Sequence, residues 1–399
     1  MRPVTSAECA AAASIGSPAA VPPVAEAVGM DVAAEASTLG TSASSTSDPH
    51  EIGAAVSIVD GNTGSHNVNG GTTGIEEQLE LCKEENARLR AEKAELEAIA
   101  NKPCKPGWVL ESDDTVHYYT GLPSVKVFHS LLDLILPHLN QKVKSGRPRQ
   151  LQPADEFLLV LMRLRLGLQI EDLQHRFRLK AKSRASKIIK KWIPLLACAF
   201  KPLLVWPSRR RVLQCMPAAF KAQQTYKNVR IILDCFEFEM EAPSSLSLNT
   251  MTYSRYKGRN TVKVLFGVTP DGFVSFVSRA YPGSISDNSI TIKSGILDMI
   301  SPGDDIMADK GFTLSNSELQ PRGLRVVVPP FRCGAVQFST QEVETTKVIA
   351  NLRIVVENCI MRARYCRFLR NQIPVSSVRT ASDIVLICAV LANLRPPIR

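Results

Sequence analysis

The stretch VRIILDCFEFEM, residues 229–240, predicts a β-strand in which Asp234 lies among apolar side chains. Because strand side chains alternate between two faces, Asp234 shares its face with Ile232, Phe236 and Phe238. A strand that is apolar on both faces over most of its length is typical of the centre of an α/β sheet. Burying a carboxylate there is costly unless a cation or strong hydrogen-bond donors compensate it. Asp234 is therefore either a metal ligand or a strand-end residue that meets water or backbone donors.

Downstream of this strand, the hydrophobic pattern predicts the rest of a mixed sheet. Two apolar runs, Thr261–Val268 and Phe273–Ser278, flank the turn Thr269-Pro270-Asp271-Gly272, which is a clear hairpin signal. Shorter apolar strands are expected at Asp305–Ala308 and Arg325–Val328.

A long helix is predicted to begin at Ser339, because Ser339 and Glu342 have the spacing of a capping box. One apolar stripe of this helix would face the sheet: Val348, Leu352, Val355 and Cys359. Strands followed by helices in this order predict an α/β fold, with a mixed sheet flanked by helices.

Residues 151–200 have the pattern of a helix-turn-helix. Pro153 begins one helix, Ile170–Phe177 forms a short second one, and a third starts at about Arg184 after a turn at Leu179–Ser183. Apolar residues of the third helix, Ile188, Ile189 and Trp192, point inward. Its other face carries Arg184, Ser186, Lys187, Lys190 and Lys191. A DNA recognition helix needs such donors in front of apolar anchors, although trihelical protein-contact modules share the pattern.

A separate helix is predicted ahead of this unit, over Leu122–Leu139, opened by Pro123 and Ser124. A basic linker, Lys142–Arg149, follows it. The tract Gly146-Arg147-Pro148-Arg149 either enters an A·T-rich minor groove or serves as a plain linker.

The N-terminal quarter of the chain divides into two segments. Residues 1–74 contain no aromatic residue and show no periodicity, so they are predicted to be disordered. From Ile75 the apolar positions step by four and three, with Asn86 at an a position, which favours a parallel homodimer through residues 75–100; a single solvated helix fits almost as well. The predicted organisation is a disordered segment at 1–74, a coiled coil at 75–102, a helical region at 118–200 with its helix-turn-helix at about 151–200, and an α/β domain at 229–394.

The net charge of +10 is unevenly distributed along the chain. Residues 151–230 hold 17 Lys and Arg against four Asp and Glu, an excess of 17 − 4 = 13, whereas residues 1–74 hold one basic residue against seven acidic ones. This excess suits a polyanion such as nucleic acid, although a solvated basic surface has the same composition. The later stretch TYSRYKGRNTVK combines two tyrosines with Arg255, Lys257 and Lys263, a mixture that can hold a DNA strand by stacking and phosphate contacts.

The ten cysteines occur singly, without a C-x-x-C pair or histidines at zinc spacing. Neither a zinc module nor a disulfide framework is predicted, and a reduced, intracellular protein is the simpler interpretation. The N-terminus lacks a Leu-rich core, so a secretory signal is not expected. The apolar run Ile384–Leu391 is too short to cross a bilayer, so no membrane partner is expected.

Three carboxylates are candidates for one site at the edge of the predicted sheet. Asp234 lies on the first strand, Asp309 follows a later strand at its carboxyl end, and Glu357 lies off the apolar stripe of the long helix. Carboxyl ends of strands are where α/β sheets place ligands. Such a cluster can hold two divalent ions roughly 3.5–4 Å apart that activate a water or hydroxyl for phosphodiester transfer. Oxygen ligands favour Mg²⁺ or Mn²⁺ over zinc.

Seven stretches between Tyr118 and Ile398 together resemble one family. They are YYTGLPS, LQPADEFLLVLMRLRLGLQIEDLQHRF, LDCFEFEMEAPSSL, TYSRYKGRNTVKVLFGVTPDG, PGSISD, IMADKGF and RIVVEN. With them the chain resembles the PIF/Harbinger-like group of DDE transposases and their domesticated relatives. The resemblance implies a ribonuclease-H-like nuclease fold behind a helix-turn-helix, with Asp234, Asp309 and Glu357 as a metal triad. Asp287 matches another acidic position of the family, or it caps a helix.

The expected function is that of a transposase-derived protein that binds double-stranded DNA in the nucleus and carries a divalent-metal-dependent DDE endonuclease or strand-transfer domain. The chain departs from relatives at Asn358 and at Met361-Arg362, where they often carry Arg and a Gly-Arg pair. The alternative is a domesticated DNA-binding or adaptor protein that keeps the fold without cleavage. A ribonuclease is disfavoured because a helix-turn-helix reads duplex DNA.

Overall fold

The centre of the molecule is a mixed sheet built around the strand that carries Asp234. The structure, a computed structural model, describes residues 72–101, 106–140, 151–330 and 339–398. Strand β1 (Val229–Glu239) pairs antiparallel with β3 (Arg259–Val268) and parallel with β6 (Asp305–Met307). β7 (Arg325–Val327) extends the parallel side, and three short strands pair with β3: β2 (Tyr253–Ser254), β4 (Val274–Val277) and β5 (Tyr281–Pro282). The predicted α/β class, the central strand and the hairpin that joins β3 to β4 are confirmed.

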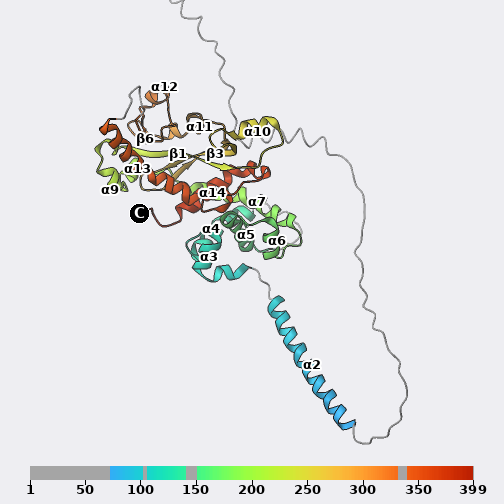
Figure 1. Cartoon of the computed structure of the whole chain (residues 1–399). Coiled ribbons are helices and arrows are strands. Elements are labelled where there is room, and N and C mark those ends of the chain that lie inside the picture. The colour runs from blue at the N-terminus through green and yellow to red at the C-terminus, as the bar shows by residue number, and fades with distance from the viewer. Residues whose placement is uncertain (1–71, 102–105, 141–150, 331–338, 399) are drawn as a thin grey trace, which may run out of the picture. The chain divides into compact units, whose positions relative to one another are not determined.

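The two faces of β1 contribute to two different hydrophobic cores. Ile232, Phe236 and Phe238 belong to the larger core, and Ile231 and Leu233 to the smaller one. Helices α13 (Thr340–Ala363) and α14 (Ala381–Asn393) cover the face of the larger core, and α11 (Asp287–Lys293) with α12 (Asn316–Leu319) covers the other (Figure 1). A strand covered on both faces has to be apolar on both, as the sequence indicated. The sheet curls and is flanked by helices, which is consistent with a ribonuclease-H-like fold.

Helix α13 begins where the sequence predicted. The hydroxyl of Ser339 accepts a hydrogen bond from the backbone N–H of Glu342, whose carboxylate in turn accepts one from the N–H of Ser339 at 2.8 Å. The four residues of the predicted apolar stripe are buried or partly buried against the sheet. Glu357 lies off that stripe and is exposed, which leaves its carboxylate available to a site.

Three helices ahead of the sheet form the predicted helix-turn-helix: α5 (Pro153–Leu166), α6 (Ile170–Arg176) and α7 (Lys182–Phe200). Inside this bundle, Nε1 of the fully buried Trp192 donates to Oε2 of Glu156 at 2.7 Å, which satisfies both polar groups. Helix α7 packs against α14, and one continuous hydrophobic core joins the bundle to the sheet. The chain from Pro106 onward is therefore one compact unit.

Helix α2 (Thr72–Asn101), the first in the described part of the chain, belongs to a second unit. It begins at Thr72, three residues before the predicted seam, so the end of the segment predicted to be disordered is helical. Leu79 and Leu89 of the seam are half exposed in the single chain, so an apolar edge is open to a second copy. Residues 1–71, and the linker tract within residues 141–150, lie outside the described residues.

The segment Val375–Asn393 is long and apolar enough to span a membrane by length and composition alone. The sequence missed this because a 3-10 helix, η7 (Val375–Thr380), runs into α14 and lengthens the helical segment to 19 residues. More than half of the segment, 56%, is buried inside the protein, and α14 contacts α7, α13 and β4. These contacts are those of a core helix.

The remaining helical elements are α3 (Asp113–Thr120) and α4 (Val125–Asn140), which pack against the helices of the bundle, and a series of shorter ones. In chain order the shorter ones are η1 (Pro106–Glu111), η2 (Lys201–Leu203), α8 (Arg209–Gln214), α9 (Ala218–Lys221), η3 (Gln224–Tyr226), α10 (Leu246–Thr252), η4 (Ile296–Met299), η5 (Gln320–Arg322) and η6 (Arg367–Leu369).

Candidate active site

The pairing of β1 with β6 brings two carboxylates to the same edge of the sheet. The two strands run parallel, and their register places Ile232 opposite Met307. Asp234 follows Ile232 by two residues within β1, and Asp309 follows Met307 by two residues just after β6 ends, so both lie toward the same edge of this strand pair. Carboxyl ends of parallel strands form the usual ligand edge of an α/β sheet. The predicted convergence of Asp234 and Asp309 therefore follows from the strand register.

Asp234 carries a carboxylate that is costly to ionise in this environment. Among the described residues its carboxylate accepts one hydrogen bond, at Oδ1, from the backbone N–H of Cys235 at 2.8 Å. Burial raises the pKa of Asp234 to about 6, against the opposing charge of Arg353, and the nearby carboxylates of Asp309 and Glu357 add to the rise. Within the described ranges no cation forms a direct ion pair with Asp234. The nearby charge of Arg353 therefore compensates only part of the cost of ionising this partly buried carboxylate.

Arg353 supplies a cation to the neighbouring carboxylate. Its Nη1 donates to Oδ1 of Asp309 at 2.9 Å, and its side chain is only 9% exposed. Its Nε has no hydrogen-bond partner in the described part of the chain. Arg353 precedes Glu357 by four residues on α13, so the two side chains lie one above the other on the helix. Sequence reasoning missed Arg353, although this spacing beside Glu357 was the available signal.

Asp287 is held by a lysine on the adjacent strand. Nζ of Lys263 lies 3.3 Å from Oδ1 of Asp287 and 3.1 Å from Oε1 of Glu237. Ser286, rather than Asp287, caps α11, so the capping role predicted as one alternative for Asp287 is wrong. A Cβ placed on Gly311 would lie 2.8 Å from Oδ2 of Asp287, so a side chain at position 311 would displace the carboxylate of Asp287.

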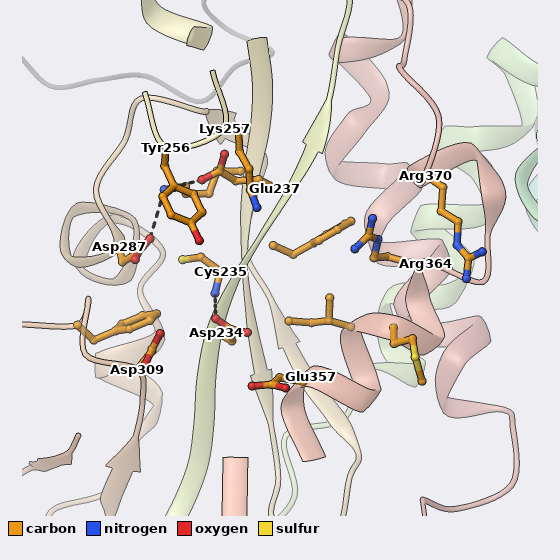
Figure 2. Close-up of a pocket in the computed structure, with 15 residues that line it drawn as sticks. Asp234, Cys235, Glu237, Tyr256, Lys257, Asp287, Asp309, Glu357, Arg364 and Arg370 are labelled. Atoms are coloured by element: carbon orange, nitrogen blue, oxygen red, sulfur yellow. Dashed lines mark hydrogen bonds and ion pairs between the residues drawn. The ribbon is translucent and has the colours of Figure 1, made fainter. Parts of the chain in front are cut away.

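One open cavity of about 1020 Å³ is lined by the four carboxylates of Asp234, Asp287, Asp309 and Glu357. Figure 2 shows Asp234 in the middle of it, with Asp309 to one side and Glu357 to the other, while Asp287 lies above Asp309. Tyr256 and Lys257 form one rim. Across the cavity, Arg364 and Arg370 form the facing rim (Figure 2). The structure thus brings all four predicted carboxylates to one cavity that has basic side chains on two sides.

The donor set fits a hard divalent cation. All four acidic groups offer oxygen, the ligand that Mg²⁺ and Mn²⁺ prefer, and no described cation forms an ion pair with the partly buried Asp234. Among the described residues, no three Asp, Glu, His or Cys side chains lie close enough together to hold an ion as they stand. The carboxylate of Asp309 is instead ion-paired with the guanidinium of Arg353.

The predicted DNA-binding residues form two largely exposed groups, and one further residue is buried. On α7, Lys187, Lys190 and Lys191 are exposed and Arg184 is half-buried; Nζ of Lys191 lies 3.7 Å from Oε2 of Glu156. In the stretch after α10, Arg255 and Lys257 are exposed beside Tyr256, whose ring lies 4.8 Å from Nζ of Lys257. Lys263 is the exception and corrects the sequence interpretation, because it is buried and ion-paired with Glu237 and Asp287 rather than free for DNA.

A second groove adjoins the first. It has a volume of about 840 Å³ and shares Glu237, Tyr256 and Lys263 with the active-site cavity. Tyr253 and Arg255 line it as well. The stretch 253–263 thus lies beside the carboxylates, as its position between two strands predicted.

The fold and this cavity define an α/β protein with an acidic cluster at the carboxyl edge of its parallel strands. Comparison with known families extends this to a class of protein. Residues 233–393 match the family described as DDE superfamily endonuclease, and residues 149–202 match the helix-turn-helix of DDE superfamily endonuclease. No curated protein and no solved structure matches the chain. The two matches support a DDE superfamily transposase, with a transposase-like nuclease domain and a helix-turn-helix that suggests DNA binding.

Proposed function

We propose that this chain is a PIF/Harbinger-like transposase-derived protein that cuts or transfers DNA phosphodiesters with divalent metal ions. One observation carries the proposal: Asp234 on β1 and Asp309 just after β6 lie toward the same edge of two adjacent parallel strands, and the partly buried Asp234 has no ion-pair partner among the described residues. Carboxylates placed in this way serve metal-assisted phosphodiester chemistry in a nuclease.

In this proposal Asp234, Asp309 and Glu357 hold Mg²⁺ or Mn²⁺, and Asp287 lies beside them. When bound, the ions supply a polarised phosphate and a more acidic water or hydroxyl. The protein's own contribution is positional. Lys263 fixes Asp287 from β3, and the close approach of Gly311 fixes the loop of Asp309 against it.

The DNA strand is proposed to lie along the rim formed by Arg255, Tyr256 and Lys257. The ring of Tyr256 is 87% exposed, so it offers a stacking surface to a base at the mouth of the cavity. Cationic contacts to phosphate hold a strand without reading its sequence. In this proposal α7 recognises the DNA sequence, with its basic side chains facing a duplex: Arg184, Lys187, Lys190 and Lys191.

A second function is supported by one contact. The Arg353–Asp309 ion pair neutralises one of the three carboxylates, as it would in a domesticated DNA-binding or adaptor protein that has given up cleavage. The departure at Asn358 and Met361-Arg362 from the family pattern points the same way. In either case we propose a nuclear location and a homodimer through residues 75–100.

A nicking assay on supercoiled plasmid separates the two functions. The full chain is incubated with plasmid and either Mg²⁺ or Mn²⁺, and with EDTA as the metal-free control. Conversion to the open circle that depends on metal and is lost in Asp309→Asn supports the nuclease. Plasmid binding without metal-dependent nicking would instead identify the cleavage-deficient protein.

A further inference from the structure

A group of arginines surrounds one tyrosine just beyond the C-terminal end of α13. The arginine cluster, as we define it, comprises Arg165, Arg364, Arg367, Arg370 and Arg395. Three of its guanidinium carbons lie over the ring of Tyr365, at 5.0 Å for Arg165, 5.8 Å for Arg370 and 4.1 Å for Arg395. Nη1 of Arg165 also donates to the carbonyl oxygen of Tyr365 at 2.6 Å. The cluster therefore draws on α5, the end of α13 and the C-terminal segment.

The positive charge of this cluster has no acidic counterpart. Over the described residues, none of the five arginines forms an ion pair with Asp or Glu. Elsewhere in the chain arginines do, as Arg322 and Arg325 show with Asp298 and Asp305. Burial lowers the pKa of Arg165, and the nearby charges of Arg395 and Arg367 lower it further. Guanidinium groups held close together repel one another, and an anion bound from outside the chain would reduce this repulsion.

The cluster is continuous with the active-site cavity. Arg364 and Arg370 line that cavity, and the guanidinium of Arg364 lies 5.6 Å from the centre of the Phe236 ring, two residues after Asp234 (Figure 2). Tyr365 and Arg367 lie between them in the sequence and are exposed, and the guanidinium groups of Arg165 and Arg395 lie over the ring of Tyr365. A chain of phosphates leaving the cavity would meet these side chains in turn.

We propose that the arginine cluster binds the sugar-phosphate backbone of the duplex DNA that flanks the reacting strand. The inference rests on the proposed function only in taking DNA as the substrate. Guanidinium groups pair with phosphate oxygens through two N–H donors, and rings or carbonyls that hold them in place reduce the entropy lost on binding. The ring of Tyr365 is covered by guanidinium groups, so it holds the arginines instead of stacking on a base. This arrangement favours a duplex, whose bases are already stacked, over a single strand.

The test measures duplex affinity against salt in the absence of any divalent metal, so that cleavage plays no part. The full chain is titrated into a labelled random-sequence duplex in EDTA, and fluorescence anisotropy gives log affinity against log salt concentration. Each lost phosphate contact reduces the slope by about 0.9, so the triple variant Arg367→Gln, Arg370→Gln, Arg395→Gln is expected to lose about 2 to 3 from it. The control variant Arg210→Gln, Arg211→Gln, Lys221→Gln removes the same charge from exposed positions of α8 and α9 and keeps the parent slope.

A second pair of variants tests the role of Tyr365 without changing the charge. Tyr365→Phe keeps the ring and is expected to keep the parent slope, whereas Tyr365→Ala releases the three guanidinium groups and lowers affinity several-fold. Equal slopes for the triple variant and its control, with the parent binding normally, would overturn this inference alone. A parent that shows no salt-dependent duplex binding would overturn the proposed function as well. Loss of polyglutamate binding in the triple variant, with an unchanged duplex slope, would assign the cluster to an acidic protein and refute the DNA assignment.

Discussion

The guanidinium of Arg353 donates to the carboxylate of Asp309 at 2.9 Å, from the helix that also carries Glu357 four residues later. The same guanidinium opposes the rise in the pKa of Asp234, so one buried cation acts on two carboxylates of the candidate triad. A metal ion bound by these carboxylates would have to compete with Arg353 for Asp309. In the metal-free protein, Arg353 therefore reduces the repulsion between the carboxylates. By the same contact it lowers their affinity for a metal ion.

The first prediction concerns Arg353→Met. Removing the competing cation should tighten Mn²⁺ binding about tenfold, equivalent to about 1.4 kcal/mol, and should lower the melting temperature of the metal-free protein. Titration calorimetry of Mn²⁺ and thermal denaturation in EDTA measure the two effects. Arg353→Lys keeps the charge on a shorter donor and should fall between the parent and Arg353→Met. Weaker Mn²⁺ binding in Arg353→Met would show that the arginine supports the metal site instead of competing with it.

The second prediction concerns the pH dependence of stability without metal. The pKa of Asp234 is raised from its ordinary value to about 6 in the folded protein, whereas an unfolded Asp titrates near about 4. Between these two values the unfolded state releases its proton and the folded state retains it, so stability is full below about pH 4 and is lost as pH rises through about 6. Asp234→Asn should remove this loss and gain about 2–3 kcal/mol over the parent above pH 6 in EDTA.

Chemical denaturation of parent and variant at a series of pH values isolates this difference. Asp309→Asn serves as the comparison, because Asp309 is more than half exposed and its carboxylate is paired. Parallel pH profiles for the parent and Asp234→Asn would contradict the prediction. In the presence of Mn²⁺ the order should reverse, because only the parent gains from binding the ion.

The third prediction concerns the helix-turn-helix. Lys187→Glu with Lys190→Glu should weaken duplex binding and flatten the slope of log affinity against log salt by roughly 0.9 for each phosphate contact removed. Both lysines are exposed on α7, so the fold should be unaffected. Anisotropy titrations over a range of salt concentrations give the slope. If the slope stays at the parent value, α7 does not contact the DNA backbone.

The fourth prediction separates holding a strand from choosing a site. Arg255→Ala with Lys257→Ala should slow metal-dependent nicking several-fold or more, because these exposed side chains adjoin the active-site cavity. The preference among DNA sequences should stay as in the parent, because we propose that α7, and not this rim, reads the sequence. Arg259→Ala is a matched control, because Arg259 is already paired with Glu239. Changed site preference with normal nicking would refute the assignment.

Local signals in the sequence were enough to predict much of the fold. The capping box at Ser339 and the turn before Gly272 each depend on a few adjacent residues, and both are present. The convergence of Asp234 and Asp309 could also be predicted, because the carboxyl ends of parallel strands meet at one edge of a sheet.

Contacts between residues distant in sequence could not be predicted. Lys263 alternates correctly within its strand, but its burial depends on α11 bringing Asp287 against it from 24 residues away. The Arg353–Asp309 pair spans 44 residues and depends on how α13 crosses the sheet. Side chains such as Lys263 and Arg353 look like ordinary surface cations in a sequence, because nothing local reveals which carboxylate they will meet.

The packing of α7 against α14 has a consequence for where a cut would fall. Because α7 and the central sheet share one hydrophobic core, they cannot swing independently as two bodies on a flexible tether would. In any complex in which α7 reads a site while the cavity engages the same duplex, the number of base pairs between them is set by the protein's interior. A core substitution such as Trp192→Ala would then alter the offset or the uniformity of the cut before it altered the sequence recognised.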